Sequence, residues 1–325
     1  KAVRRLRGQN RLALTGTPIE NSVRDLWSIF EFLMPGYLGS AKIFKERYEV
    51  PISKHRDEAA QKRLSKRIGP FILRRLKRDV AKDLPEKLEQ ISYCELSREQ
   101  KALYQSVLDA GCKEVFESVQ ANGMNKSRMV ILTALLRLRQ ICCDGRLIKA
   151  DGLEFSDKSG KIALFEELIQ EAVDGEHRTV VFSQFTSMLQ LLKTSLDELG
   201  ISYCYLDGTT KDRASEVGRF QSSEIPVFLM SLKAGGVGLN ITAADTVMHV
   251  DPWWNPAVEA QATDRVHRIG QSRVVTSYKL IAKETVEEKI LNLQRKKKEL
   301  IASALSEEDL FKEGMTWDEL KGLFD

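Results

Sequence analysis

The second half of the chain alternates short apolar runs with stretches of helical periodicity, and this alternation constrains the fold most. From Gly160 onward, runs rich in β-branched and other apolar residues occur at 179–182, 226–230 and 246–250, separated by segments with helical spacing. Strands that alternate with helices in this way build βαβ units around a parallel sheet. The pattern therefore predicts an α/β fold with a mostly parallel sheet.

The first half of the chain has a more helical pattern. Residues 40–68 are charged and helical, and short strands are expected at Arg11–Leu14 and Phe71–Leu73. Pro85 marks a boundary, because proline ends any preceding helix. Strand character then returns at Gln90–Leu96.

A helical insertion is expected at about residues 97–150. Ser97 followed by Gln100 is a capping-box signature, and it opens a long helix through about residue 118. After a loop near Gly123, a second helix is predicted at 127–143.

The composition is that of a globular protein. The 325 residues are 42% hydrophobic and 30% charged, and this length favours about two domains. The 50 basic and 46 acidic residues give a net charge of +4, which does not establish nucleic-acid binding unless the basic residues cluster. Basic clusters occur at 74–78 and 295–298, where DNA contact and a solvated helix face are both open.

Five cysteines without a C-x-x-C pair argue against a disulfide framework and against a zinc site. We therefore expect reduced thiols and no bound metal. No apolar run approaches the length of about 20 residues that spans a membrane. The expected compartment is the cytoplasm or nucleoid of a bacterium, or the nucleus of a eukaryote.

Two arginines, Arg265 and Arg268, stand three residues apart behind Asp264 and ahead of Gly270. On a helix, residues at this spacing share one face, so both guanidinium groups can point at one anion. This arrangement suits a triphosphate supplied from elsewhere. A surface helix with scattered charge is the alternative interpretation.

A glycine-rich segment follows the apolar run at 226–230. Gly235, Gly236 and Gly238 lie within four residues, and glycine lets backbone N–H groups approach a phosphate closely. An ordinary turn between a strand and a helix remains the alternative.

Six motifs occur in an order that resembles the Swi/Snf-type ATPases, which are superfamily 2 DNA translocases. The resemblance runs from about residue 10 to residue 300, and its motifs are the glycine-rich segment together with Leu14–Asn21, Val181–Thr186, Leu206–Thr209, Trp254–Pro256 and Asp264–Gln271. It implies the end of a first RecA-like lobe at 1–80, a second RecA-like lobe at 81–305 with its helical insertion, and a C-terminal brace or tail at 306–325.

The resemblance also implies roles for individual residues. Arg265 and Arg268 correspond to catalytic arginine fingers. Residues implied in ATP binding or coupling are Gly236, Gly238, Asn240, Gln261, Asp264, Gly270 and Gln271. Residues implied in DNA binding are Thr15, Thr17, Ser183, Gln184, Thr186, Gly208, Thr209, Ser231, Lys233 and Trp253.

Several of these residues have plainer interpretations. Ser183 and Thr186 are also good N-cap residues for the helix that follows, and Asp207 with Gly208 is ordinary turn chemistry. Of the paired tryptophans, we expect Trp254 to be packed and Trp253 to be more exposed.

The two histidines in this part of the chain have no plausible metal partner nearby. We expect His249 to be a core residue on an apolar strand. We expect His267 to support the geometry of the arginines.

Two motor elements are missing from the sequence. There is no G-x-x-x-x-G-K-[ST] phosphate loop and no Asp-Glu box, and Ser159-Gly160-Lys161 is followed by Ile162 instead of Ser or Thr. The chain therefore resembles the second half of a motor, with ATP and Mg²⁺ bound mainly by the missing upstream half. We expect the fragment to be inactive alone.

The expected partner is double-stranded DNA, gripped through its phosphate backbone, with a DNA-bound protein as a possible target. A monomer without a membrane role is expected. The alternatives are a strand-separating helicase and a non-catalytic DNA or protein interaction module.

Overall fold

The computed structural model describes residues 6, 8–15, 23–55, 57–73, 75, 77–148, 155, 158–235, 238–303 and 322. Internal contacts divide the chain into two compact units. Unit 1 comprises Lys1–Val80 with Arg295–Leu320, and unit 2 comprises Ala81–Gln294 with Lys321–Asp325. The predictions for Thr17, Gly236 and the tail 306–325 lie outside the described residues, apart from Gly322.

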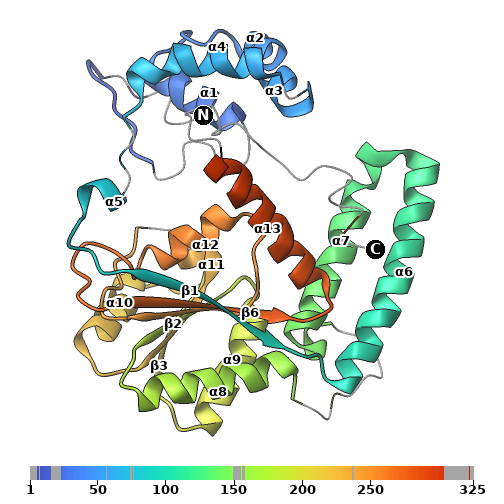
Figure 1. The fold of residues 1–325 in the computed structure, drawn as a ribbon, viewed down its shortest axis with the longest axis vertical. Coiled ribbons are helices and arrows are strands. Elements are labelled where there is room, and N and C mark those ends of the chain that lie inside the picture. Colours follow the sequence, from blue (N-terminus) through green and yellow to red (C-terminus); the bar gives the residue numbers. More distant parts are fainter. Residues whose placement is uncertain are drawn as a thin grey trace. The chain divides into compact units, whose positions relative to one another are not determined.

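A six-stranded sheet forms the centre of unit 2 (Figure 1). Its order is β1-β6-β5-β2-β4-β3, and every pairing is parallel, so the predicted parallel sheet is confirmed. The strands are β1 Lys87–Cys94, β2 Thr179–Ser183, β3 Tyr203–Leu206, β4 Val227–Ser231, β5 Thr246–His249 and β6 Val275–Ala282.

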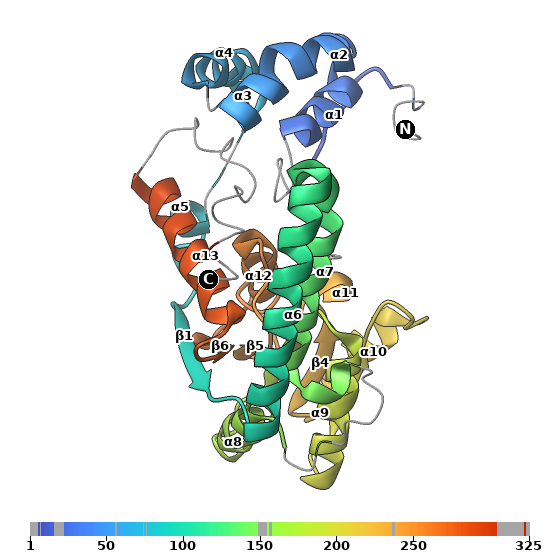
Figure 2. The ribbon, with the colours of Figure 1, turned by 90° about the vertical axis from the view of Figure 1, so that its right-hand side faces the viewer.

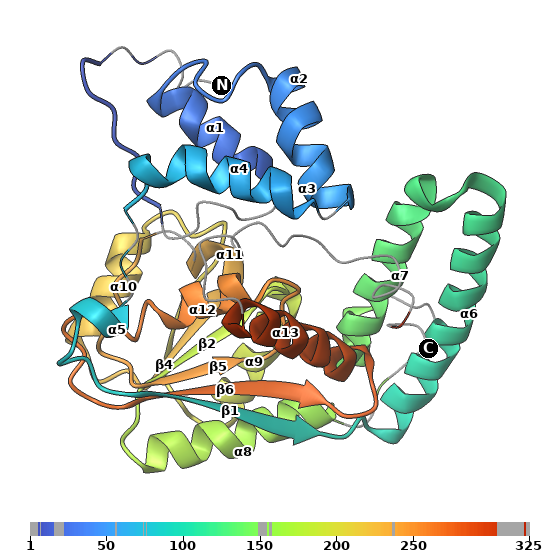
Figure 3. The same cartoon turned by 45° about the horizontal axis from the view of Figure 1, so that its top comes forward.

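Helices cover both faces of this sheet (Figure 3). Alternate residues of a strand point to opposite faces. Accordingly Val181 and Leu229 join the core under α8 and α9, whereas Val180 and Phe228 join the core under α10, α11 and α12. The helices are α8 Gly160–Asp174, α9 Thr186–Glu198, α10 Arg213–Ser222, α11 Leu232–Gly235, α12 Pro256–Thr263 and α13 Val286–Ser303.

Two long helices, α6 Arg98–Asn122 and α7 Met124–Cys143, lie side by side as a hairpin beside the sheet (Figure 2). The predicted capping box is present: Gln100 N–H donates to Ser97 Oγ, and Gln100 Oε1 accepts from Ser97 N–H. Gly123, at a φ of +70°, joins the two helices in a conformation that favours glycine. A short 3₁₀ helix, η4 Gly145–Leu147, follows.

Unit 1 is helical in its described part. Its core contains Leu26, Phe30, Phe44 and Leu64, and no described residue of this unit lies in a strand. Its elements are α1 Val23–Leu33, α2 Ala41–Phe44, the π-helix η2 Lys45–Glu49, α3 Val50–His55, α4 Glu58–Ile68, the 3₁₀ helix η3 Gly69–Phe71 and α5 Lys77–Val80.

The two strands predicted for unit 1 are wrong. Residues 11–15 have no regular structure, and Phe71 ends a 3₁₀ helix. A strand requires a partner for its backbone hydrogen bonds, and no described segment pairs with either run. Their side chains are correspondingly exposed, at 90% for Leu14 and 80% for Leu73.

Candidate nucleotide and nucleic-acid site

The arginine segment follows helix α12 but is not part of it. The helix ends at Thr263 with Asp264 as its C-cap, and residues 264–270 form successive turns. The prediction that Arg265 and Arg268 share one helix face is therefore wrong. Arg265 is half-buried and Arg268 is exposed.

The charge of Arg268 nevertheless affects the pKa of Arg265. Burial and the positive charge of Arg268 both lower the pKa of Arg265, while Asp264 raises it. Like charges held close together favour an anion that neutralises them. The segment is thus suited to binding phosphate oxygens.

The end of the glycine-rich segment lies directly beside the arginines. Ile241 N–H donates to the carbonyl of Arg265 at 3.0 Å. Gln221 on α10 holds the same loop, because its amide donates to the Asn240 carbonyl at 2.8 Å and accepts from Ala243 N–H at 3.1 Å. Asn240 itself is exposed. The fold thus brings two predicted nucleotide motifs together.

Glycines shape both loops. Gly238 has a φ of +52° and Gly270 a φ of +102°, and both are exposed, with open space where a side chain would stand. The left-handed conformation favours glycine at both positions. Gln261, on α12, is half-buried.

Two residues brace the arginine segment from inside. Gln271 is buried, and its amide donates to the carbonyls of Thr242, Ala244 and Val266. His267 Nε2 lies 2.7 Å from the carbonyl oxygen of Pro85. His267 therefore supports the loop as predicted, and Gln271 supports it as well instead of facing a ligand.

A second candidate region lies at the carboxyl edge of the sheet, where ligands bind in open α/β folds. Ser183 ends β2 and is buried, and its hydroxyl donates to Asp251 Oδ1 at 2.5 Å. Gln184 N–H donates to the same carboxylate at 3.2 Å. The Asp251 carboxylate thus ties the loop after β2 to the loop after β5.

The N-cap interpretation of Ser183 and Thr186 is wrong. Phe185 is the N-cap of α9 and has no side-chain acceptor, and the Ser183 hydroxyl instead accepts from Phe185 N–H and donates to Asp251. Thr186 is exposed at the first turn of α9. Its hydroxyl and the open N–H groups of that turn remain suited to a phosphate.

The turn after β3 is organised by one carboxylate. Asp207 Oδ1 accepts from Thr209 N–H at 2.8 Å and from the Thr209 hydroxyl at 2.6 Å. The Thr209 hydroxyl bond is the main cause of the lowered pKa of Asp207, although burial opposes it. Gly208 and Thr209 remain exposed at the tip of this turn.

Strand β4 ends at Ser231, which is buried and whose hydroxyl accepts from Ala234 N–H at 3.3 Å. Lys233 is exposed on the short helix that follows. Of this pair, Lys233 is the residue whose charge is available to a ligand. Thr15 in unit 1 is also exposed.

The paired tryptophans are both half-buried. Trp253 packs against the core, and its N–H donates to Glu259 Oε1 at 2.6 Å. Because both residues are half-buried, the expectation that Trp253 is the more exposed one stays a prediction. Glu259 on α12 and Gln294 on α13 bond to the backbone of Trp253.

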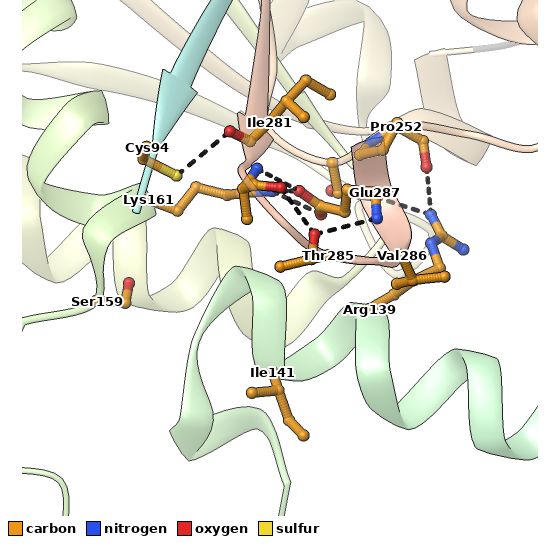
Figure 4. A network of polar contacts seen from close by, with 12 residues as sticks. Cys94, Arg139, Ile141, Ser159, Lys161, Pro252, Ile281, Thr285, Val286 and Glu287 are labelled. Atoms are coloured by element: carbon orange, nitrogen blue, oxygen red, sulfur yellow. Dashed lines mark hydrogen bonds and ion pairs between the residues drawn. The ribbon is translucent and has the colours of Figure 1, made fainter. Parts of the chain in front are cut away.

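Sequence reasoning missed Arg139, which is 1% exposed on α7. Its guanidinium donates to Gln184 Oε1 at 3.1 Å and to the Pro252 carbonyl, and it lies 3.7 Å from Asp251 Oδ2 (Figure 4 shows the Pro252 contact). A signal was available, since Arg139 stands four residues after Leu135 on the apolar stripe of its helix.

A buried ion pair explains the sequence that mimics a phosphate loop. Lys161 Nζ lies 2.5 Å from Glu287 Oε2, and both side chains are fully buried (Figure 4). Burial alone would lower the pKa of Lys161, yet the Glu287 carboxylate raises it. Ser159 caps α8, and a Cβ at Gly160 would stand 1.8 Å from the carbonyl oxygen of Glu95. Each of the three residues has a structural role.

His249 is a buried core histidine, as predicted. It stacks on Phe182 with ring centroids 5.5 Å apart, and its Nε2 lies 2.9 Å from Thr263 Oγ1. Burial lowers the pKa of His249 to about 4, so the ring is neutral at pH 7.

Among the described residues, no group of three or more metal-ligating side chains is assembled, and the five cysteines are free thiols. No helix in the described part of the chain is long and apolar enough to cross a membrane.

A parallel sheet with helices on both faces is the architecture of a RecA-like lobe. Two family models match the chain: the SNF2-related domain over residues 1–147 and the helicase conserved C-terminal domain over residues 160–270. The chain belongs to the SWI2/SNF2 family of ATPases, and its sheet corresponds to a RecA-like lobe of that family.

Two solved structures of this family resemble the chain, one of them along almost its whole length. The SWI2/SNF2 ATPase core of Sulfolobus solfataricus in complex with dsDNA is 38% identical, with a TM-score of 0.59, over 99% of this chain and 68% of that one. The C-terminal domain of a Sulfolobus solfataricus SWI2/SNF2 ATPase is 31% identical, with a TM-score of 0.56, over 73% and 98%.

An uncharacterized ATP-dependent helicase of Mycoplasma genitalium is 42% identical over 328 residues, which is 100% of this chain and 31% of the relative. The chain thus spans about a third of the length of such curated relatives.

Proposed function

We propose that the chain is the second half of an ATP-driven motor that translocates along double-stranded DNA and remodels protein–DNA complexes. The observation that carries this proposal is the juxtaposition of Arg265 with the loop that ends at Ile241. A nucleotide bound by an upstream lobe would meet a positively charged, glycine-shaped surface there.

In this proposal Arg265 and Arg268 act as arginine fingers on the γ-phosphate. They contribute no covalent chemistry; they neutralise charge that develops on the equatorial oxygens during phosphoryl transfer. ATP and Mg²⁺ are held mainly by upstream residues that this sequence does not contain. The chain alone is accordingly inactive.

The DNA contacts lie on the second region, at the carboxyl edge of the sheet. Exposed residues follow three neighbouring strands there: Gly208 and Thr209 in a turn, Thr186 at the first turn of α9 and Lys233 on α11. A surface of this kind reads the phosphate backbone and little of the base sequence. The similar archaeal core in complex with dsDNA supports a duplex as the ligand.

Unit 1 offers additional positive charge. Residues 54–78 contain 10 basic and 2 acidic residues, so the net charge of this stretch is larger than the +4 of the whole chain. Lys62, Arg63, Lys66 and Arg67 are exposed on α4, opposite its buried apolar stripe. Such a surface supports a polyanionic partner.

Translocation without strand separation is tested with a triplex substrate. A chain extended upstream through its phosphate loop should displace a third strand from duplex DNA when ATP is added, and should leave the two duplex strands paired. Steady ATP-dependent separation of those strands would contradict the proposal and favour a conventional helicase.

The biological target in this proposal is a protein bound to DNA, and the motor acts as a monomer in the cytoplasm or nucleoid of a bacterium or in a eukaryotic nucleus.

A further inference from the structure

Arg139 lies outside both candidate ligand surfaces, yet it contacts the loops after β2 and β5. It projects from α7, a helix of the hairpin, and only 1% of the residue is exposed. A buried guanidinium is costly unless its charge and its N–H groups are satisfied. The contacts of its guanidinium group therefore indicate the role of Arg139.

Three aromatic rings surround the guanidinium. Its central carbon lies 5.8 Å from the ring centroid of Phe185, 5.7 Å from that of Trp253 and 5.0 Å from that of Trp254. Phe185 belongs to the loop after β2, and both tryptophans belong to the loop after β5. Cation–π attraction thus fastens both loops to one side chain.

Polar contacts connect the same two loops. The guanidinium donates to Gln184 Oε1 in the first loop and to the Pro252 carbonyl in the second, and Asp251 lies 3.7 Å away. Asp251 in turn accepts from Ser183 and from Gln184 N–H. Burial raises the pKa of Asp251, while Arg139 is the largest influence that lowers it.

The network is incompletely satisfied. Arg139 Nε and Gln184 Nε2 are buried, and neither has an acceptor among the described residues. Unsatisfied buried donors are rare and concentrate where function limits stability. These two belong to side chains that are hydrogen-bonded to each other.

We propose that Arg139 is a positioning residue for DNA binding. It holds the loops 183–186 and 251–255 in a fixed position relative to each other and connects them to the α6–α7 hairpin. It touches no phosphate itself, because its guanidinium is enclosed. This inference rests on the proposed function, in which the first of these loops contributes Thr186 to the DNA surface.

Lysine at this position keeps the charge that Asp251 requires, but it cannot form the planar fork that reaches Gln184 and Pro252 together. We therefore expect Arg139→Lys in the full chain to weaken binding of a labelled duplex by about tenfold, as measured by fluorescence anisotropy. Arg137→Lys is the matched control, because Arg137 is exposed on the same helix, and it should bind like wild type.

The salt dependence of binding separates positioning from contact. Loss of a phosphate contact reduces the slope of log affinity against log salt by about 1, whereas loss of a positioning residue leaves the slope unchanged. A partly unfolded variant would show fewer active molecules at an unchanged dissociation constant. We expect Arg139→Lys to raise the dissociation constant at the wild-type slope.

Phe185→Leu provides a second variant that keeps the ion pair with Asp251. It should weaken binding about threefold, again without a change of slope. Wild-type affinity in a folded Arg139→Lys variant, or a reduced slope, would overturn the inference. If the wild-type chain did not bind duplex DNA at all, the proposed function would fail, and the inference with it.

Discussion

The two candidate regions are built on different physical principles. At the carboxyl edge of the sheet, loops are fastened by buried side chains, among them the pairs Arg139–Asp251 and Lys279–Glu259. The arginine segment is fixed by uncharged groups that bond to backbone carbonyls, namely the Gln271 amide, the His267 ring and the N–H of Ile241, and Arg268 is exposed.

In the proposed function the two regions have different tasks. A surface that holds DNA through many turnovers needs loops of fixed shape, which buried side-chain networks provide. In the proposed function, an arginine that stabilises a transition state on another lobe must remain available, and uncharged hydrogen bonds to its segment leave its charge unpaired by buried carboxylates. The predictions below test this division from the largest expected effect to the smallest.

The largest effect is expected from Arg265→Ala. In a chain that includes the upstream lobe, ATP turnover at saturating DNA should fall by about 10³-fold, because an arginine finger contributes about 10³–10⁵ to phosphoryl transfer. Duplex binding should be unchanged. Arg219→Ala, which removes an exposed arginine paired with Glu216 on α10, is the control and should hydrolyse ATP at the wild-type rate. Equal losses of turnover in both variants would contradict the assignment of Arg265 as an arginine finger.

Lys161→Met tests how strongly the carboxyl edge depends on buried charge. It leaves the Glu287 carboxylate buried without its partner, so the free energy of unfolding should fall by about 3–5 kcal/mol in urea titrations. The double variant Lys161→Met/Glu287→Leu should recover most of that loss. A single variant as stable as wild type would show that the pair is not a structural requirement.

The neutral His249 predicts a pH dependence of stability. Its pKa is about 4 in the folded protein and about 6.5 in the unfolded chain. Between these values the unfolded state binds the extra proton, so the free energy of unfolding falls as the pH drops, by about 3 kcal/mol in total. His249→Gln retains a partner for Thr263 but does not titrate. A wild-type protein that lost no more stability than this variant between pH 6.5 and pH 4 would contradict the assignment.

The smallest effect is expected from Lys233→Ala. Loss of one phosphate contact should weaken duplex binding a few-fold and lower the slope of log affinity against log salt by about 1. Lys113→Ala, at an exposed lysine of α6, should change neither quantity. An unaltered slope in Lys233→Ala would remove that lysine from the DNA surface.

Local patterns predicted the parts of the fold that local physics decides. The parallel sheet followed from periodicity, and the start of α6 followed from the Ser97–Gln100 capping box. The strand at Phe71–Leu73 failed because strand formation depends on a partner elsewhere in the chain. A β-rich sequence alone does not provide that partner.

The candidate site was predictable in composition but not in geometry. Its motifs identified Arg265 and Arg268, yet the predicted helix continued past Thr263, where α12 ends. Long-range bonds such as the one from His267 to Pro85 hold the segment in turns instead. Arg139 was missed because it belongs to none of the six motifs. Its position on the apolar stripe of α7 was the available clue.

The most direct test is ATP hydrolysis with and without duplex DNA, measured for this chain and for the same chain extended upstream through its phosphate loop. The account predicts no turnover by this chain alone and DNA-stimulated turnover by the longer one. Turnover by this chain alone would contradict the account, because it would require a complete nucleotide site within these 325 residues.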